Sequence, residues 1–143
     1  MRLTDCFMEL MAYTAYFLKT VDQKQPAYEQ VKADVLRSLT RSEECLKKDP
    51  TMRDDYDLAR FAVCAWVDEC ILNSSWKEKN QWKREQLQRI YYRTTDAGEE
   101  FFDRLNLLGL EKRDVREVYY LCLALGFMGR YCKPGDEYLL GQV

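Results

Sequence analysis

The chain has 143 residues, an ordinary length for one domain, and it carries 22 Lys and Arg against 24 Asp and Glu, a net charge of −2. This balance gives no electrostatic basis for binding nucleic acid or an anionic membrane surface. The chain has no histidine, the commonest general base and the commonest metal ligand, so enzymes and metal sites lose most of their support. Its longest apolar run, residues 118–128, is shorter than the roughly 20 residues of a membrane span.

Two amphipathic helices are predicted at the start of the chain. From Leu3 to about Val21, apolar residues recur at helical intervals, and Pro26 lies beyond the end of this segment. A second helix is predicted from Ala27 to about Lys48, with a narrow apolar face and a broad charged face that we interpret as solvated.

The stretch from Asp57 to Trp76 is the centre of the expected fold. Its apolar residues occur on every side of a helical wheel, so a helix from about residue 54 to 72 must be enclosed by its neighbours. From Leu58 to Leu72 the charged residues are Arg60, Asp68 and Glu69. Because acidic residues are rarely buried unpaired and are unfavourable near a helix C-terminus, we interpret the acidic pair as placed for a partner.

Four further elements follow. Trp82 to Tyr92 has helical spacing, and another helix is expected from about Ala97 to Leu108, with Gly98 allowing a close backbone approach in its first turn. Glu111 to Met128 is apolar nearly all round in its last turns and should lie beside the central helix. Tyr138 to Leu140 could form one helical turn. No segment alternates with period two, which predicts a single all-α domain.

Six cysteines are spread along the chain without a CxxC pair. No signal peptide is present and the spacing is wide, so we expect reduced thiols that serve as small core residues rather than a disulfide framework. The cysteines are Cys6, Cys45, Cys64, Cys70, Cys122 and Cys132.

No pattern in the chain indicates catalysis. Asp68 and Glu69 are the obvious acid/base candidates, but adjacent helical residues point about 100° apart and cannot flank one bond. The chain also has no phosphate-binding loop and no nucleophile motif. We therefore expect no catalytic residue, cofactor, metal ion or small-molecule substrate. An acid/base enzyme would need a closed pocket of convergent polar groups, and a metal-binding bundle would need three or four convergent ligands.

Three segments carry a specific resemblance. Residues 59–69, ARFAVCAWVDE, with Trp76 are similar to the pattern A-R-[YF]-A-L-C-A-x-x-D-E…W, and residues 98–102, GEEFF, to G-G-E-x-F-F. Residues 120–131, YLCLALGFMGRY, are similar to Y-L-C-L-A-L-G-F-x-G-[RK]-[YF]. These patterns are those of the DotU/TssL family, also called IcmH, inner-membrane proteins of bacterial type VI and type IVB secretion systems. The other signature positions are Arg60, Cys64, Gly98, Phe101, Phe102, Gly126, Phe127, Gly129, Arg130 and Tyr131.

The resemblance implies a cytoplasmic domain of about six to seven helices, arranged as two three-helix bundles in a hook shape. In the family, a C-terminal transmembrane anchor follows this domain and holds it in the inner membrane. The anchor is absent from residues 1–143, so we expect a soluble fragment of a longer protein. We expect that the anchored full-length protein can form a homodimer.

The family role implies a non-catalytic scaffold and adaptor that links the inner-membrane complex to the cytoplasmic baseplate, most directly in a type VI system. The implied partners are a TssM/IcmF-type inner-membrane protein and a TssK-like baseplate protein, with no nucleic acid. One alternative is a protein that stabilises the core complex of a type IVB system, and another is an acid/base enzyme that uses Asp68 or Glu69.

The resemblance also assigns a candidate partner-binding groove. Asp68 and Glu69 match the acidic pair that lines a groove in the family, and Trp76 closes the same motif, although a large aromatic there also fits a core position. The alternative is that Arg60 or Arg130 pairs with one carboxylate in a structural role. The family's [FY]-H-x-E-x-x-G-G pattern is not kept, because residues 91–98 read YYRTTDAG and lack its histidine, glutamate and first glycine.

Overall fold

A computed structural model describes residues 2–131 and 136–142 of the chain, and every regular element in these ranges is helical. The predicted all-α class is confirmed, with five long helices in place of the expected six to seven. The long helices are α1 (Met8–Thr20), α2 (Tyr28–Ser42), α4 (Arg53–Leu72), α7 (Ala97–Leu107) and α8 (Arg113–Ala124). The short elements are η1 (Leu3–Phe7), α3 (Cys45–Lys48), η2 (Pro50–Met52), α5 (Lys79–Arg84), α6 (Leu87–Tyr92), η3 (Gly129–Tyr131) and α9 (Glu137–Leu140).

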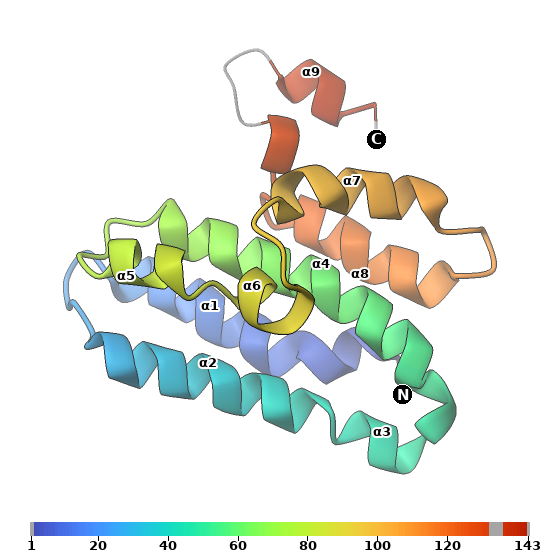
Figure 1. Cartoon of the computed structure of the whole chain (residues 1–143), viewed down its shortest axis with the longest axis horizontal. Coiled ribbons are helices and arrows are strands. Elements are labelled where there is room, and N and C mark those ends of the chain that lie inside the picture. Colours follow the sequence, from blue (N-terminus) through green and yellow to red (C-terminus); the bar gives the residue numbers. More distant parts are fainter. Residues whose placement is uncertain (1, 132–135, 143) are drawn as a thin grey trace.

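Helix α4 lies at the centre of the molecule, as predicted. Figure 1 shows α1 and α2 on one side of it and α7 and α8 on the other, while α5 and α6 pack across it. Every residue from Phe61 to Asp68 is buried, which is more than two turns of helix, so this part of α4 has no solvent face. The buried side chains on both sides of α4 form one core, and the expected division into two three-helix bundles in a hook shape stays a prediction.

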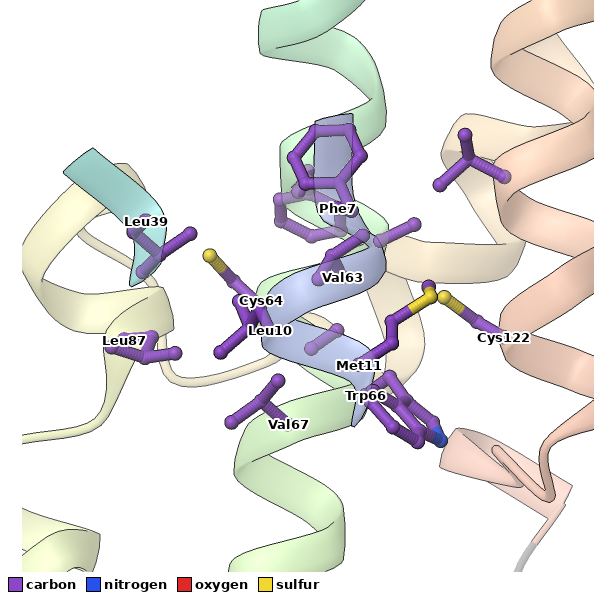
Figure 2. Close-up of a cluster of buried hydrophobic side chains, with 14 of the residues drawn as sticks. Phe7, Leu10, Met11, Leu39, Val63, Cys64, Trp66, Val67, Leu87 and Cys122 are labelled. Atoms are coloured by element: carbon purple, nitrogen blue, oxygen red, sulfur yellow. The ribbon is translucent and has the colours of Figure 1, made fainter. Parts of the chain in front are cut away.

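The middle of the core contains side chains from helices on both sides of α4. In Figure 2, Leu10 and Met11 of α1 lie against Val63 and Trp66 of α4, and Cys122 of α8 lies beside Met11. Cys64 and Cys122 are fully buried, free thiols, as expected for small core residues. Burial raises the pKa of both thiols, which keeps them protonated and unreactive.

Two predicted helices are interrupted in the structure. The helix expected from Ala27 to Lys48 ends at Ser42, and a turn leads into α3. The helix expected from Trp82 to Tyr92 is divided into α5 and α6, because Gln86 has an extended backbone conformation at their junction. The first break lies next to Cys45, which is bonded to Cys6 from the start of the chain. The second lies next to Leu87 and Gln88, whose backbone N–H groups bind Asp68 of α4.

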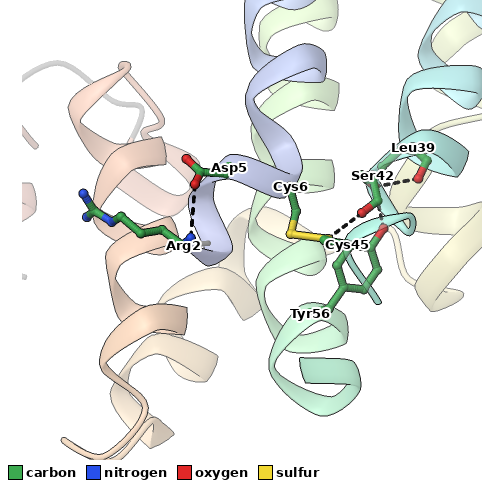
Figure 3. The surroundings of a disulfide bond; sticks show 7 residues. All are labelled: Arg2, Asp5, Cys6, Leu39, Ser42, Cys45 and Tyr56. Atoms are coloured by element: carbon green, nitrogen blue, oxygen red, sulfur yellow. Dashed lines mark hydrogen bonds between the residues drawn. A yellow bond between two sulfur atoms is a disulfide. The ribbon is translucent and has the colours of Figure 1, made fainter. Parts of the chain in front are cut away.

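One pair of cysteines contradicts the expectation of reduced thiols. Cys6 of η1 and Cys45 of α3 form a disulfide across a sequence separation of 39 residues (Figure 3). Their spacing along the chain carries no sign of this pairing, because only the packing of η1 against the α2–α3 region brings them together. Cys132 lies outside the described residues, and Cys70 is a free thiol.

In residues 2–131 and 136–142, no helix has both the length and the apolar content that a membrane crossing requires.

Candidate functional site

Asp68 lies in the last turns of α4 and is only 1 % exposed. Its Oδ1 accepts hydrogen bonds from Trp82 Nε1 at 2.9 Å and from the backbone N–H of Leu87 at 3.0 Å. Its Oδ2 accepts hydrogen bonds from the Gln88 backbone N–H at 2.9 Å and from Gln88 Nε2 at 3.3 Å. All four partners are donors. This environment suits an ionised carboxylate, which is an acceptor only.

The hydrogen bonds of Asp68 determine where α6 begins. Leu87 and Gln88 are the first two residues of α6, and backbone N–H groups in a first helical turn have no partner inside their own helix. A carboxylate from α4 therefore takes the place of a local N-cap and lies at the positive end of the helix dipole. Burial raises the pKa of Asp68, and these hydrogen bonds oppose that rise.

Gln88 extends this network to a third helix. Its side chain is 7 % exposed, and its Oε1 accepts the backbone N–H of Ala97, the first residue of α7, at 2.9 Å. Its Nε2 also donates to Gln86 Oε1 at 2.9 Å. The sequence did not reveal this role, because one glutamine in a mixed polar segment carries no distinguishing pattern.

Glu69 is partly buried and binds a different part of the chain. Its Oε2 accepts the backbone N–H of Met128 at 2.9 Å, and its Oε1 accepts that of Gly129 at 2.8 Å. Both donors belong to the C-terminal turn, which we define as residues 126–131. Burial raises the pKa of Glu69, and the two N–H groups oppose that rise.

The C-terminal turn begins with a glycine that ends α8. Gly126 has a φ of 104°, and the Phe127 N–H donates to Cys122 O at 3.0 Å while the Gly126 N–H donates to Leu123 O at 3.0 Å. This pair of hydrogen bonds is a Schellman motif, in which glycine adopts the left-handed conformation that other residues rarely adopt. The chain then reverses and buries the Phe127 ring, which is 1 % exposed.

Gly129 packs directly against Gly98 in the first turn of α7. A Cβ atom on Gly129 would lie 2.6 Å from Gly98 O and 2.8 Å from the Phe127 ring, and one on Gly98 would lie 3.3 Å from Gly129 Cα. The close approach predicted for Gly98 is therefore confirmed. Around this contact the rings of four aromatic residues pack edge to face or tilted: Phe101, Phe102, Phe127 and Tyr131.

The two arginines of the sequence motifs do not pair with the acidic residues. Arg130 binds Asp103 at 2.7 Å and lies 3.4 Å from a Glu99 oxygen, both on α7. Arg60 donates to Tyr92 Oη at 3.0 Å and forms an ion pair with Glu43 at 3.6 Å. The alternative that Arg60 or Arg130 neutralises Asp68 or Glu69 is therefore wrong.

Trp76 is a core residue. It is fully buried, its Nε1 donates to Pro26 O at 2.9 Å, and its ring packs against Phe17 and Tyr28 at centroid distances of 5.4 and 5.9 Å. The expectation that Asp68 and Trp76 line an open groove is wrong, because the fold encloses both side chains. Only Glu69 of the three is partly exposed, and its contact with a partner stays a prediction.

Two surface cavities of the described residues are lined by neither Asp68 nor Glu69. The groove between α1 and α2 has a volume of about 540 Å³ and includes Tyr13, Tyr16, Phe17, Pro26 and Ala27. A cleft of about 220 Å³ lies over the disulfide. A general acid or base needs an open position next to the reacting atoms, and Asp68 has none because its oxygens already bind four donors.

Replacing Asp68 with Asn should destabilise the domain more than replacing Glu69 with Gln. The new amide would turn a donor toward N–H groups that have no other acceptor, so we expect the free energy of unfolding to fall by about 2–4 kcal/mol. Glu69 is partly exposed and water can replace lost contacts, so we expect a fall of about 1 kcal/mol for Glu69→Gln. Urea denaturation at neutral pH measures both values, and an equal or smaller effect of Asp68→Asn would contradict the assigned hydrogen bonds.

Replacing Gly129 with Ala should destabilise the domain by about 1–3 kcal/mol, because the new methyl group would meet the Gly98 carbonyl and an aromatic ring. The matched control is Gly98→Ala, whose milder contact is offset by the higher helix propensity of Ala, so we expect a change of less than about 1 kcal/mol. Thermal unfolding followed by circular dichroism compares the two variants. A more stable Gly129→Ala protein would show that the two backbones are not in contact.

Comparisons with known proteins agree with this architecture. The model of a family described as "Type VI secretion system protein DotU" matches residues 2–142. The solved structure of the cytoplasmic domain of TssL from Acinetobacter baumannii is 27 % identical, with a TM-score of 0.82, and the alignment covers 99 % of this chain and 94 % of that chain. A search of curated proteins finds no match. The resemblance noted in the three sequence motifs is thereby confirmed, and the chain belongs to the DotU family of type VI secretion system proteins.

Proposed function

We propose that this domain is a non-catalytic adaptor of a type VI secretion apparatus, linking the inner-membrane complex to the cytoplasmic baseplate. The observation that carries the proposal is the family match over residues 2–142. The likeness to the cytoplasmic domain of TssL supports a position on the cytoplasmic side of the inner membrane. The proposed partners are a TssM/IcmF-type inner-membrane protein and a TssK-like baseplate protein, with a second copy of the chain in the anchored form.

The arrangement of the acidic pair supports a scaffold rather than an enzyme. Asp68 and Glu69 use their oxygens to hold other segments of the chain, so they act inside the domain. A rigid domain of this kind can present fixed surfaces to two partners at once.

The groove between α1 and α2 is our candidate for the baseplate contact. Tyr16 is 68 % exposed on its rim, and Pro26 and Ala27 contribute apolar surface above the buried Phe17. The Tyr13 hydroxyl donates to Asp34 at 3.0 Å, which fixes the orientation of a second ring. Well-positioned aromatic side chains are enriched at protein interfaces, where they contribute most of the binding energy.

A capture experiment tests both parts of the proposal. The immobilised domain is incubated with lysate that contains the baseplate and membrane-complex proteins of the same gene cluster. We expect the wild type to retain the TssK-like protein and Tyr16→Asp to lose it, because the new charge would be desolvated in the interface. The matched control is Tyr120→Asp, which alters another exposed tyrosine, 41 % accessible on α8, and should bind like the wild type.

The outcomes separate the function from the surface. If Tyr16→Asp binds as well as the wild type, the adaptor proposal stands and the α1–α2 groove is the wrong surface. If the folded wild type retains neither the TssK-like nor the TssM/IcmF-type protein, the adaptor proposal itself is contradicted.

A further inference from the structure

The Cys6–Cys45 disulfide lies at the wall of a surface cleft. The two side chains are 9 % and 6 % exposed, and both line the cavity of about 220 Å³. Their Cα atoms are 6.0 Å apart, a usual separation for a disulfide. Polar side chains of Asp5, Glu9 and Lys48 line the same cleft, so it is open to water-soluble molecules.

The free thiols in the core are in a different environment. Cys64 and Cys122 are 0 % exposed and lie among the apolar side chains of Figure 2. The disulfide therefore borders a cleft that a small thiol in solution can enter, whereas the two core thiols are enclosed by apolar side chains.

The disulfide joins two short elements that depend on tertiary contacts. Helix α3 has four residues, which is too short to be stable by itself, and it leads directly into η2 and α4. Element η1 packs against α8 and α4, and its Cys6 provides the covalent connection to α3. An ion pair between Glu9 and Arg41, at 3.0 Å, crosses the same cleft. This ion pair joins α1 to α2, so opening the disulfide leaves α3 held by the packing of its own Cys45 and Leu46 and by its connections to α2 and η2.

We propose that Cys6 and Cys45 form a reversible thiol–disulfide switch that small thiols such as glutathione operate through this cleft. Reduction loosens α3 while α4 and the core stay folded. A bacterial cytoplasm keeps most thiols reduced, and disulfides found there are usually transient or redox-sensing. The expectation of a reducing environment rests on the proposed cytoplasmic position of the domain. The geometry of the cleft does not depend on that position.

The chemistry consists of two exchange steps. A glutathione thiolate attacks one sulfur of the disulfide, which forms a mixed disulfide and releases the other cysteine as a thiolate that takes up a proton. A second glutathione thiolate attacks the glutathione sulfur of the mixed disulfide and releases the remaining cysteine. In total, two glutathione molecules become one oxidised glutathione, and their two electrons and two protons reduce Cys6 and Cys45. Oxidised glutathione reverses the sequence.

The first measurement uses the purified chain in buffers that range from reduced to oxidised glutathione, without denaturant. Free thiols are labelled with a maleimide and located by mass spectrometry. We expect Cys6 and Cys45 to be labelled together in the reduced buffer and protected together in the oxidised buffer, while Cys64 and Cys122 stay unlabelled in both. Labelling of Cys6 and Cys45 in the oxidised buffer would overturn the proposal, and so would their protection in the reduced buffer.

The second measurement is amide hydrogen exchange in the same two buffers. We expect exchange in residues 43–52 to rise at least about tenfold on reduction, with no change in the buried part of α4, because local opening follows the loss of a local constraint. The double variant Cys6→Ser with Cys45→Ser should exchange at the reduced level in both buffers. The matched control Cys70→Ser removes a free thiol elsewhere and should respond like the wild type.

Equal exchange of the wild type in both buffers would overturn the switch. Because both measurements use the isolated chain, their failure is independent of whether the domain captures a baseplate protein.

Discussion

The fold depends on two neighbouring carboxylates that hold two different segments of the chain against the end of α4. Asp68 binds the backbone N–H groups that begin α6, and Glu69 binds those of Met128 and Gly129 in the C-terminal turn. Adjacent helical residues point about 100° apart, so the pair reaches in two directions. The N–H groups at the start of α6 and in the C-terminal turn are bound by these carboxylates where they meet α4. Without the carboxylates these N–H groups would be buried and unpaired, which costs free energy.

The hydrogen bonds of Glu69 explain why the three motif segments, residues 59–69, 98–102 and 120–131, lie next to one another in the fold. The glycines at 126 and 129 shape the C-terminal turn so that its N–H groups face Glu69, and Gly98 leaves room for the turn against α7. Arg130 then ties the turn to acidic residues of α7. The result is a helical scaffold whose acidic residues position its own elements, which is consistent with a structural component of a secretion apparatus.

The sequence predicted the helices and the burial of α4, because a helix that is apolar on all sides is stable in water only when its neighbours enclose it. It also predicted the close approach at Gly98. It could not predict the partners of Asp68, since the donors come from residues about 20 positions later that look like an ordinary polar helix. The same limit applies to Cys6 and Cys45, which only the packing of η1 brings together. The core position that a large aromatic fits at Trp76 is confirmed, with Phe17 and Tyr28 of earlier helices as its neighbours.

The most direct test of the role of the two carboxylates is residue-resolved amide exchange by NMR in Asp68→Asn and Glu69→Gln. We predict that Asp68→Asn accelerates exchange at Leu87 and Gln88 and leaves Met128 and Gly129 unchanged, whereas Glu69→Gln does the reverse. Unchanged exchange at Leu87 and Gln88 in folded Asp68→Asn would contradict this role and would make Asp68 available again as a contact for a partner.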